Sequence, residues 1–452
     1  MALNGNLTGS SQFFSDELFY NDVATQSLRL DNSASSLLTR TPSAGNRKTW
    51  TWSAWIKRVD IGRDQDFFTA EGSGGQLYAI MITSGDQLQI YAASAVLLLS
   101  TQLLRDTSAW YHIVVKSDTT QGTASDRLKI YLNGSEITSF ATDNRGSYAQ
   151  NTDYGINSNV KHNIGSNQAG GNFGDYYIAE VNFVDGTAYD ASHFGETKNG
   201  VWIPKKYTGS YGTQGFHLEF KQTGDGSSTA SSSTIGADTA NSNHYKDTNL
   251  DAYDSNMPDS PENNFATWNS LRKSESASTF SEGNLKAVIP VSSANSICAT
   301  MGVSSGKYYW EVQRVAERPT LGVGDSTDVA SVSGFPTGGN EFGYFAGSGN
   351  KYPGDSSYGA TYANGDIIGF ALDMDAGTLV AYKNNASQGT LATGLTDTIF
   401  PFVYNGTASL TVIGNFGQDS SFAGTKTAQG NTDGNGIGDF YYAPPSGFLA
   451  LC

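Results

Sequence analysis

Cysteine and long apolar runs are scarce in this chain of 452 residues. Its two cysteines, Cys298 and Cys452, lie far apart, which predicts neither a disulfide framework nor a CxxC metal site. The longest apolar runs, such as Ala95 to Leu99, fall far short of the roughly 18 residues that span a bilayer. We therefore expect no membrane insertion.

Basic charge and an export signal are also missing. Acidic residues outnumber basic residues 43 to 27, which gives a formal net charge of −16. Such a charge repels phosphate backbones and anionic membrane surfaces, so we expect no nucleic-acid partner. The N-terminus has no basic stretch followed by an apolar core, so we expect no signal peptide and synthesis in a host cytoplasm.

What the chain does have is typical of β-structure. Only 15% of its residues are charged, whereas it holds 52 Gly, 24 Tyr and 23 Phe. Aromatic residues suit a pleated, half-buried surface, and glycine with Asn, Asp and Ser supplies tight turns. The chain is longer than a single hydrophobic core normally accommodates, which predicts two domains.

Alternating strand patterns separated by turns occur in both halves of the chain. In WTWSAWIK, one face would hold Trp50, Trp52, Ala54 and Ile56, and Trp55 would lie on the other. Asn133-Gly134 supplies the left-handed dipeptide of a two-residue hairpin turn. The second half repeats the pattern in KYYWEVQR, DIIGFALDMD and SLTVIGNFG. These patterns predict an all-β fold of two antiparallel sandwiches.

The stretch between these halves is polar, small and poor in bulky aliphatic residues. This composition predicts a connecting segment that forms no hydrophobic core of its own, in which Phe265 and Trp268 are isolated anchors. The expected organisation is an N-terminal arm (1–26), a first sandwich (27–220), a polar linker (221–278), a second sandwich (279–417) and a C-terminal extension (418–452).

Motifs in each half resemble known families. WTWSAWIKR, AWYHIVVKSD, RLKIYLNGSEI and HNIGSNQAGGNFGDYYIAEVNFVDG are similar to laminin-G/concanavalin A-like domains, which are jelly-roll sandwiches. GKYYWEVQ, LGVGD, GDIIGFALDMDAGTLVAYKNN and FPFVYNGTASLTVIGNFGQ resemble SPRY domains, which are bent sandwiches. The resemblance implies a concanavalin A-like jelly roll followed by a SPRY-like sandwich.

The pairing of these modules resembles structural proteins of tailed bacteriophages, especially those of marine bacteria. This resemblance implies a non-enzymatic virion surface protein: a fibre, spike or capsid-decorating appendage that contacts other virion proteins and attaches to host polysaccharide. By analogy with fibres, we expect a homo-oligomer, with a trimer favoured. The alternatives are a carbohydrate-binding adhesin and a polysaccharide depolymerase.

Catalytic residues are not expected. Cleavage needs two carboxylates about 5 to 10 Å apart, and family members that cleave β-glucans carry ExDxE on one strand. Here the comparable strand, YYIAEVNFVDG, holds Glu180 alone, with Asn182 and Val184 at the next same-face positions. Glu180 is therefore interpreted as a solvated or turn-pinning residue. The five histidines form no HxH or HExxH motif.

Candidate binding residues lie in loops. No cofactor is expected except calcium. Asn431, Asp433 and Asn435 alternate before a glycine as in EF-hand loops, and Asp439 follows. The last position of such a loop holds a bidentate Glu, whereas this chain has Tyr442 there. Stretches rich in Tyr, Gly and Asn suit either sugar stacking or contact with a neighbouring subunit. Their predicted ligand residues are Asn172, Asp175, Tyr176, Tyr344, Tyr352 and Tyr358.

Overall fold

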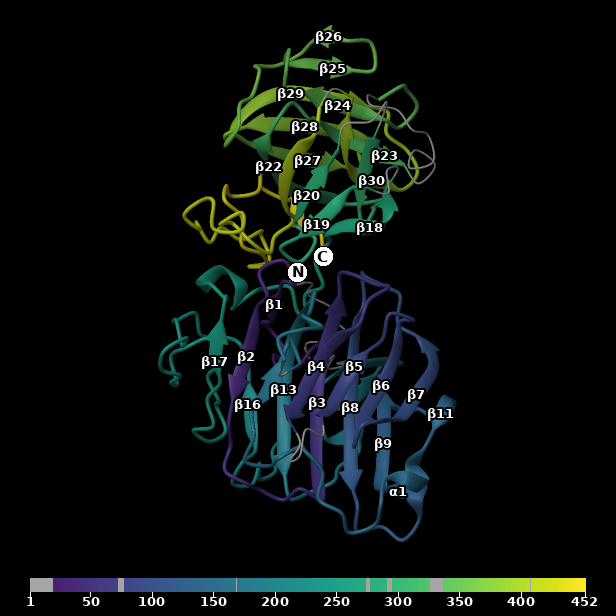
Figure 1. Cartoon of the computed structure of the whole chain (residues 1–452). Coiled ribbons are helices and arrows are strands. Elements are labelled where there is room, and N and C mark those ends of the chain that lie inside the picture. Colours follow the sequence, from purple (N-terminus) through teal and green to yellow (C-terminus); the bar gives the residue numbers. More distant parts are fainter. Residues whose placement is uncertain are drawn as a thin grey trace, which may run out of the picture.

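The structure, a computed structural model, describes residues 19–71, 77–167, 169–273, 277–290, 295–325, 336–406 and 408–452. It consists of two antiparallel β-sandwiches stacked end to end, with the C-terminus at the junction between them (Figure 1). The predicted fold class is confirmed. None of the helices in the described ranges is long and apolar enough to cross a membrane.

The first sandwich packs two large sheets face to face. Sheet I contains, in spatial order, β1 (Leu28–Leu30), β13 (Tyr176–Asp185), β3 (Thr49–Arg58), β8 (Trp110–Asp118), β9 (Leu128–Leu132) and β10 (Ser135–Glu136), with β16 (Phe216–Leu218) also paired to β13. Sheet II contains β11 (Phe140–Asp143), β7 (Ala95–Leu103), β6 (Gln87–Ala92), β5 (Leu77–Ile82), β4 (Gln65–Glu71), β12 (His162–Ile164), β2 (Leu37–Arg40) and β17 (Lys246–Thr248).

Short elements complete this half of the chain. They are the hairpin of β14 (Gly195–Lys198) and β15 (Val201–Pro204), the helix α1 (Ala124–Arg127), and the 3-10 turns η1 (Arg145–Ser147), η2 (Ala191–His193) and η3 (Ala252–Asp254).

The predicted alternation in β3 sets the core of the first sandwich. Trp50 and Trp52 are fully buried with Ala54 and Ile56, and Trp52 stacks on Phe68 of sheet II with 6.2 Å between ring centroids. The other face of β3 is covered as well. Trp55 lies 4.7 Å from the ring of His112, and a second ring, Trp202 of β15, donates its Nε1 hydrogen to His112 Nδ1 at 3.0 Å. His112 is thus a packed structural residue.

The predicted hairpin turn at Asn133-Gly134 joins β9 to β10. Both residues have positive φ, 47° and 81°, as such a turn requires. A Cβ at Gly134 would lie 2.6 Å from the Trp202 ring, so the turn also leaves room for the covering hairpin.

The second sandwich repeats the two-layer plan. Sheet III contains β18 (Trp268–Lys273), β21 (Asn295–Ala299), β30 (Ile399–Asn405), β23 (Thr320–Asp325), β24 (Phe342–Phe345), β25 (Asn350–Tyr352) and β26 (Ser356–Ser357). Sheet IV contains β19 (Thr279–Ser281), β20 (Lys286–Ile289), β31 (Leu410–Asn415), β22 (Lys307–Ala316), β27 (Ile367–Asp373), β28 (Thr378–Lys383) and β29 (Ala386–Thr393).

The segment 221–278 carries more structure than its composition indicates. It adds β17 to sheet II, and Ile235, Tyr245 and Leu250 join the core of the first sandwich. Trp268 begins β18 and is fully buried in the second core. The segment needs no core of its own because its few large side chains enter the two existing ones.

The C-terminal extension is held by a buried carboxylate. Glu311 of β22 accepts hydrogen bonds from the backbone N–H groups of Tyr441 and Tyr442, at 2.9 and 2.8 Å. Beyond them, β32 (Leu449–Ala450) pairs in parallel with β22. The last residues therefore add a short strand to sheet IV.

Candidate functional site

A groove of about 410 Å³ lies where the two sandwiches meet. From the first sandwich, its wall is made by Val59 to Ile61, which follow β3, and by Asp175, which precedes β13. From the second sandwich, β18, β19 and the turn at Gly283 close the other side. Pockets between domains are frequent ligand sites because both bodies contribute side chains.

Direct hydrogen bonds across the junction fix the two walls. The backbone oxygen of Val59 accepts from Asn284 Nδ2 at 2.7 Å and from Ser270 Oγ at 3.0 Å. Tyr177, fully buried, donates its hydroxyl to the Gly283 oxygen at 3.1 Å. These contacts lie beside the groove, so its width depends on the relative placement of the sandwiches.

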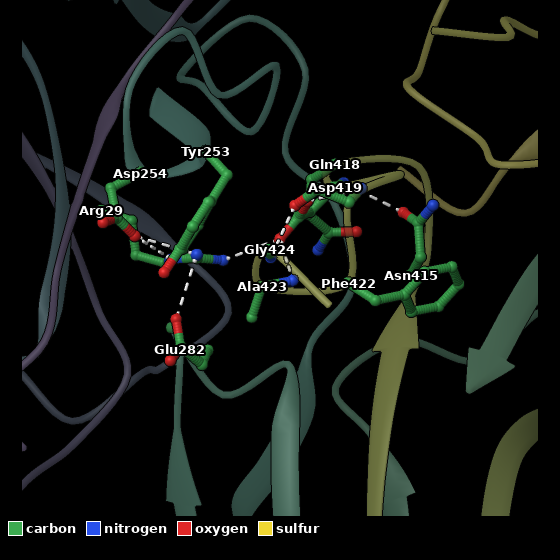
Figure 2. A network of polar contacts seen from close by, with 12 residues as sticks. Arg29, Tyr253, Asp254, Glu282, Asn415, Gln418, Asp419, Phe422, Ala423 and Gly424 are labelled. Atoms are coloured by element: carbon green, nitrogen blue, oxygen red, sulfur yellow. Dashed lines mark hydrogen bonds and ion pairs between the residues drawn. The ribbon is translucent and has the colours of Figure 1, made fainter. Parts of the chain in front are cut away.

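A buried cluster of charges holds the same junction (Figure 2). Arg29 of β1 has a side chain that is 0% exposed, and it contacts three carboxylates: Asp254 at 2.9 Å, Glu282 at 3.1 Å and Asp419 at 3.2 Å. Burial raises the pKa of Asp254 and of Glu282, and the guanidinium opposes that rise. One arginine from the first sandwich therefore joins the 221–278 segment to the second sandwich.

A second buried pair supports the junction from β3. Lys57 Nζ lies 2.8 Å from Asp259 Oδ2 and donates to the Phe265 oxygen at 2.6 Å. Trp110 Nε1 donates to the other carboxylate oxygen of Asp259 at 3.3 Å. Both charged side chains are 0% exposed, and such pairs are strongly destabilising to break singly because the remaining charge stays buried.

The polar wall of the groove is a carboxylate pair joined by an arginine. Arg63 lies 2.7 Å from Asp60 and 2.5 Å from Asp175, and the Asn32 N–H donates to Asp175 at 2.8 Å. Burial raises the pKa of Asp175 to about 6, so the carboxylate is largely ionised at neutral pH. It therefore presents hydrogen-bond acceptors to a hydroxyl-bearing ligand.

The opposite wall, from the second sandwich, is mainly polar and holds one aromatic ring, Phe280, and one aliphatic side chain, Leu271. Phe280 of β19 is partly exposed, and Lys273 Nζ lies 5.3 Å from its ring centroid while donating to the Ser278 oxygen at 2.9 Å. Leu271 of β18 is 49% exposed, which is unusual for a large aliphatic side chain. An aromatic face opposite carboxylates suits the mixed apolar and hydroxyl surfaces of a sugar ring.

Of the ligand residues predicted in the first sandwich, the structure places Asp175 in the groove. Asn172 is half-buried, and its backbone oxygen accepts from the Asp66 N–H at 3.0 Å, which pins the loop beneath Asp175. Tyr176 is 0% exposed, packs on Phe67 and donates its hydroxyl to the Asp66 oxygen. Tyr176 is therefore a core residue, which corrects its prediction as a ligand residue.

The tyrosines predicted in the second sandwich lie at its far end, near β25 and β26 (Figure 1). Tyr344 is fully buried and donates to the Ala360 oxygen, so its predicted ligand role is likewise corrected. Tyr352 and Tyr358 are half-buried, and Tyr358 donates its hydroxyl to the Gly389 oxygen at 2.6 Å. Tyr352 packs against Phe345 and Tyr358 against Tyr344, and neither ring lines the groove.

The predicted calcium loop is tied to the backbone around it. Asp433 accepts from the N–H groups of Asn435 and Ala450 at 2.8 and 2.9 Å, and Asp439 accepts from Ser420 at 3.1 Å. The Asn431 side chain donates to the Tyr441 oxygen at 2.9 Å. Across the described ranges, no three His, Cys, Asp or Glu side chains gather as metal ligands. Calcium binding at this loop stays a prediction.

Glu180 differs from its predicted role as a solvated residue, because it is only 6% exposed. It has a φ of 50° where the register of β13 against β3 shifts between Ala179 and Asn182. This bulge aims the carboxylate at His217 Nε2, 2.7 Å away, and Glu219 lies 3.7 Å from the other ring nitrogen. Negative neighbours, Glu180 foremost, raise the pKa of His217 against the effect of burial. A bulge leaves no mark in the alternation of residue types, so sequence reasoning missed this cluster.

Two family models match the chain. Residues 31–191 match the model described as the concanavalin A-like lectin/glucanases superfamily, and residues 307–419 match the SPRY domain model. The chain thus combines a laminin-G/concanavalin A-like domain with a SPRY domain. Comparison with curated proteins gives no significant match.

Solved structures match one part of the chain at a time. The SPRY domain of human HERC1 is 22% identical over 34% of this chain and 97% of its own, with a TM-score of 0.28. A heptameric SAP-like pentraxin from Limulus polyphemus is 18% identical over 37% of this chain and 79% of its own, with a TM-score of 0.28. A Bacteroides ovatus protein described as carbohydrate binding is 16% identical over 50% of this chain and 58% of its own, with a TM-score of 0.34.

Proposed function

We propose that the chain is a non-enzymatic carbohydrate-binding protein whose main site is the groove between the two sandwiches. The observation that carries this proposal is the placement of Asp175 opposite Phe280, with the sandwiches joined through Arg29. A carboxylate that accepts hydroxyl hydrogen bonds and a ring that stacks on a sugar face are complementary to one monosaccharide unit. The match of residues 31–191 to a superfamily of lectins and glucanases supports the ligand class.

Binding is favoured over hydrolysis by the state of the carboxylates. A glycosidase needs one carboxylic acid that keeps its proton and a second carboxylate, with room between them for the bond to be cleaved. In the groove, one guanidinium from Arg63 bonds both Asp60 and Asp175. In the Glu180 cluster, the imidazole of His217 occupies the space between Glu180 and Glu219.

A glycan array with the full chain tests this proposal, followed by titration of the best oligosaccharide. Phe280→Ala is expected to weaken binding about tenfold, since it removes one stacking contact. The double variant Tyr352→Ala/Tyr358→Ala is the matched control at the distal surface and is expected to bind as wild type. Loss of binding in the control with retention in Phe280→Ala would refute the groove as the site. Release of reducing ends from the bound glycan would refute the non-enzymatic assignment.

We further propose that the protein acts on the surface of a phage virion as a homo-oligomer, with a trimer favoured, and attaches to host polysaccharide. The order of the two modules, which resembles that of phage structural proteins, supports this location. Mass photometry of the purified chain and immunogold labelling of particles test it. A monomer that labels no particle would contradict it.

A further inference from the structure

A second surface pocket, of about 620 Å³, lies at the edge of sheet II where β2, β12 and β17 meet. Arg40 ends β2, Lys161 precedes β12 and Lys246 begins β17, so three strand ends bring their side chains to one place. The loop that holds Ser228 and Thr229 closes the pocket, and His244 lines it from the segment before β17. In Figure 1, this region flanks β17 at the side of the first sandwich, away from the junction.

The charge of this pocket opposes that of the chain. The whole protein carries 43 acidic and 27 basic residues, yet the pocket is lined by an arginine, two lysines and a histidine with no carboxylate among the lining residues. A cluster of cations without carboxylates creates a local positive potential that attracts an anionic group, even on a protein of net negative charge.

The arginine of the pocket is held in place by neutral groups, so no carboxylate neutralises its charge. Arg40 donates to both the backbone and side-chain oxygens of Gln214, at 3.2 and 2.7 Å, and to Asn243 Oδ1 at 2.5 Å. All of these acceptors are neutral. Within the ranges the structure covers, neither Arg40 nor Lys246 forms an ion pair.

The histidine adds a directed donor. The Asp238 N–H donates to His244 Nδ1 at 2.9 Å, so this ring nitrogen carries no proton and Nε2–H is the donor that remains. The nearest acid in this loop is itself occupied, because the Asp238 carboxylate accepts from the N–H groups of His217, Ala240 and Asn243. The hydroxyl of Thr229 also lines the pocket.

We propose that this pocket binds the anionic group of an acidic polysaccharide, a sulfate ester or a carboxylate. The Arg40 guanidinium attracts such an oxyanion by its charge, and a lysine ammonium and an imidazole N–H form charge-assisted hydrogen bonds with it. The net charge of −16 repels a densely charged nucleic acid or an anionic membrane, whereas a polysaccharide chain can place one anion in the pocket and its hydroxyls around it.

The inference extends the proposed carbohydrate-binding function to a second, chemically distinct subsite. Five of the nine lining residues lie within 228–246, beyond the region that matches the lectin/glucanase model, which ends at residue 191. The added segment 221–250 therefore gives the first sandwich a site that its jelly roll alone would lack.

Binding of three polymers of similar length to the full chain tests this inference: dextran, dextran sulfate and polygalacturonate. At physiological ionic strength, we expect no binding of dextran and clear binding of at least one anionic polymer, and the stronger of the two identifies the anion. Lys246→Glu is expected to weaken that binding about tenfold, because one charge-assisted contact becomes repulsive. Lys48→Glu makes the same charge change elsewhere on the first sandwich and is expected to change binding less than about twofold.

Equal losses in Lys246→Glu and Lys48→Glu would overturn the inference, since they would show a response to net charge alone. Equal binding of dextran and dextran sulfate would also overturn it. Unfolding temperatures of both variants identify a folding defect, and Lys161→Glu then provides a second test at an exposed position. Phe280→Ala is expected to keep its affinity for the anionic polymer, so failure of the groove and failure of this pocket are separable.

Discussion

The two ends of the second sandwich are built in different ways. At the junction end, fully buried charges from the first sandwich meet carboxylates that lie 225 and 390 residues away in the sequence. At the distal end, the contacts join strands of the second sandwich alone: Tyr358 donates its hydroxyl to the Gly389 oxygen of β29, and Lys351 lies 6.0 Å from the Tyr358 ring. The groove therefore depends on polar packing between the two sandwiches, whereas the distal tyrosines depend on packing within the second sandwich.

Among the substitutions that test this comparison, removal of the Arg29 side chain is expected to have the largest effect on stability. Arg29→Ala leaves the buried carboxylates of Asp254 and Asp419 and the partly buried Glu282 without their shared cation, which should lower the free energy of unfolding by about 3–5 kcal/mol. Calorimetry should then resolve separate transitions for the two sandwiches. Arg105→Ala is the control, because the Arg105 side chain is 57% exposed and its pair with Asp86 contributes about 1 kcal/mol or less. Equal losses in the two variants would contradict a special role for the junction.

The pH dependence of stability should distinguish the contributions of two buried carboxylates, one in each sandwich. Burial raises the pKa of Asp66 and that of Glu311 to about 7 in the folded chain. Because the folded state then holds protons that the unfolded state has released, stability should rise as the pH falls from about 8 to about 5. Asp66, beneath the groove loop, should contribute on the order of 2–4 kcal/mol to that rise.

The variant Asp66→Asn measures this contribution. It should reduce the difference in unfolding free energy between the two pH values and stabilise the chain at the higher one. The remaining pH dependence comes from Glu311, whose carboxylate accepts from the N–H groups of Tyr441 and Tyr442, and from Asp175, Asp254 and Glu282, whose pKa values burial also raises. An unchanged pH dependence, measured by denaturant titration, would rule out Asp66 as its source.

The smallest effect is expected at the distal end. Tyr358→Phe removes the hydroxyl that bonds the Gly389 oxygen and keeps the ring, so it should cost only about 0.5–1.5 kcal/mol. In this variant, calorimetry and glycan titration should detect no change at the junction. A loss of groove binding in this variant would break the comparison, since it would couple the two ends of the sandwich.

The sequence is sufficient to predict the features that depend on neighbouring residues. The alternation in β3 identifies the faces of Trp50 and Trp52, and Asn133-Gly134 identifies a turn. The resemblance to two families places both modules in order.

Features built from distant residues could not be predicted. The sequence identifies Asp175 as a candidate ligand residue, but Phe280, across the groove, lies in the other sandwich and carries no strand-pattern signal for that role. Tyr176 and Tyr344 look like rim tyrosines because loop composition does not reveal which rings turn inward. The bulge at Glu180 shifts the register of β13 against β3 without any sign in the residue pattern from which the strand faces are predicted.

A crystal structure of the full chain with the oligosaccharide selected on the array tests the central claim most directly. The account predicts sugar density in the junction groove, with a hydroxyl bonded to Asp175 and a ring face against Phe280. Density confined to the tyrosines near β25 and β26, with an empty groove, would contradict it.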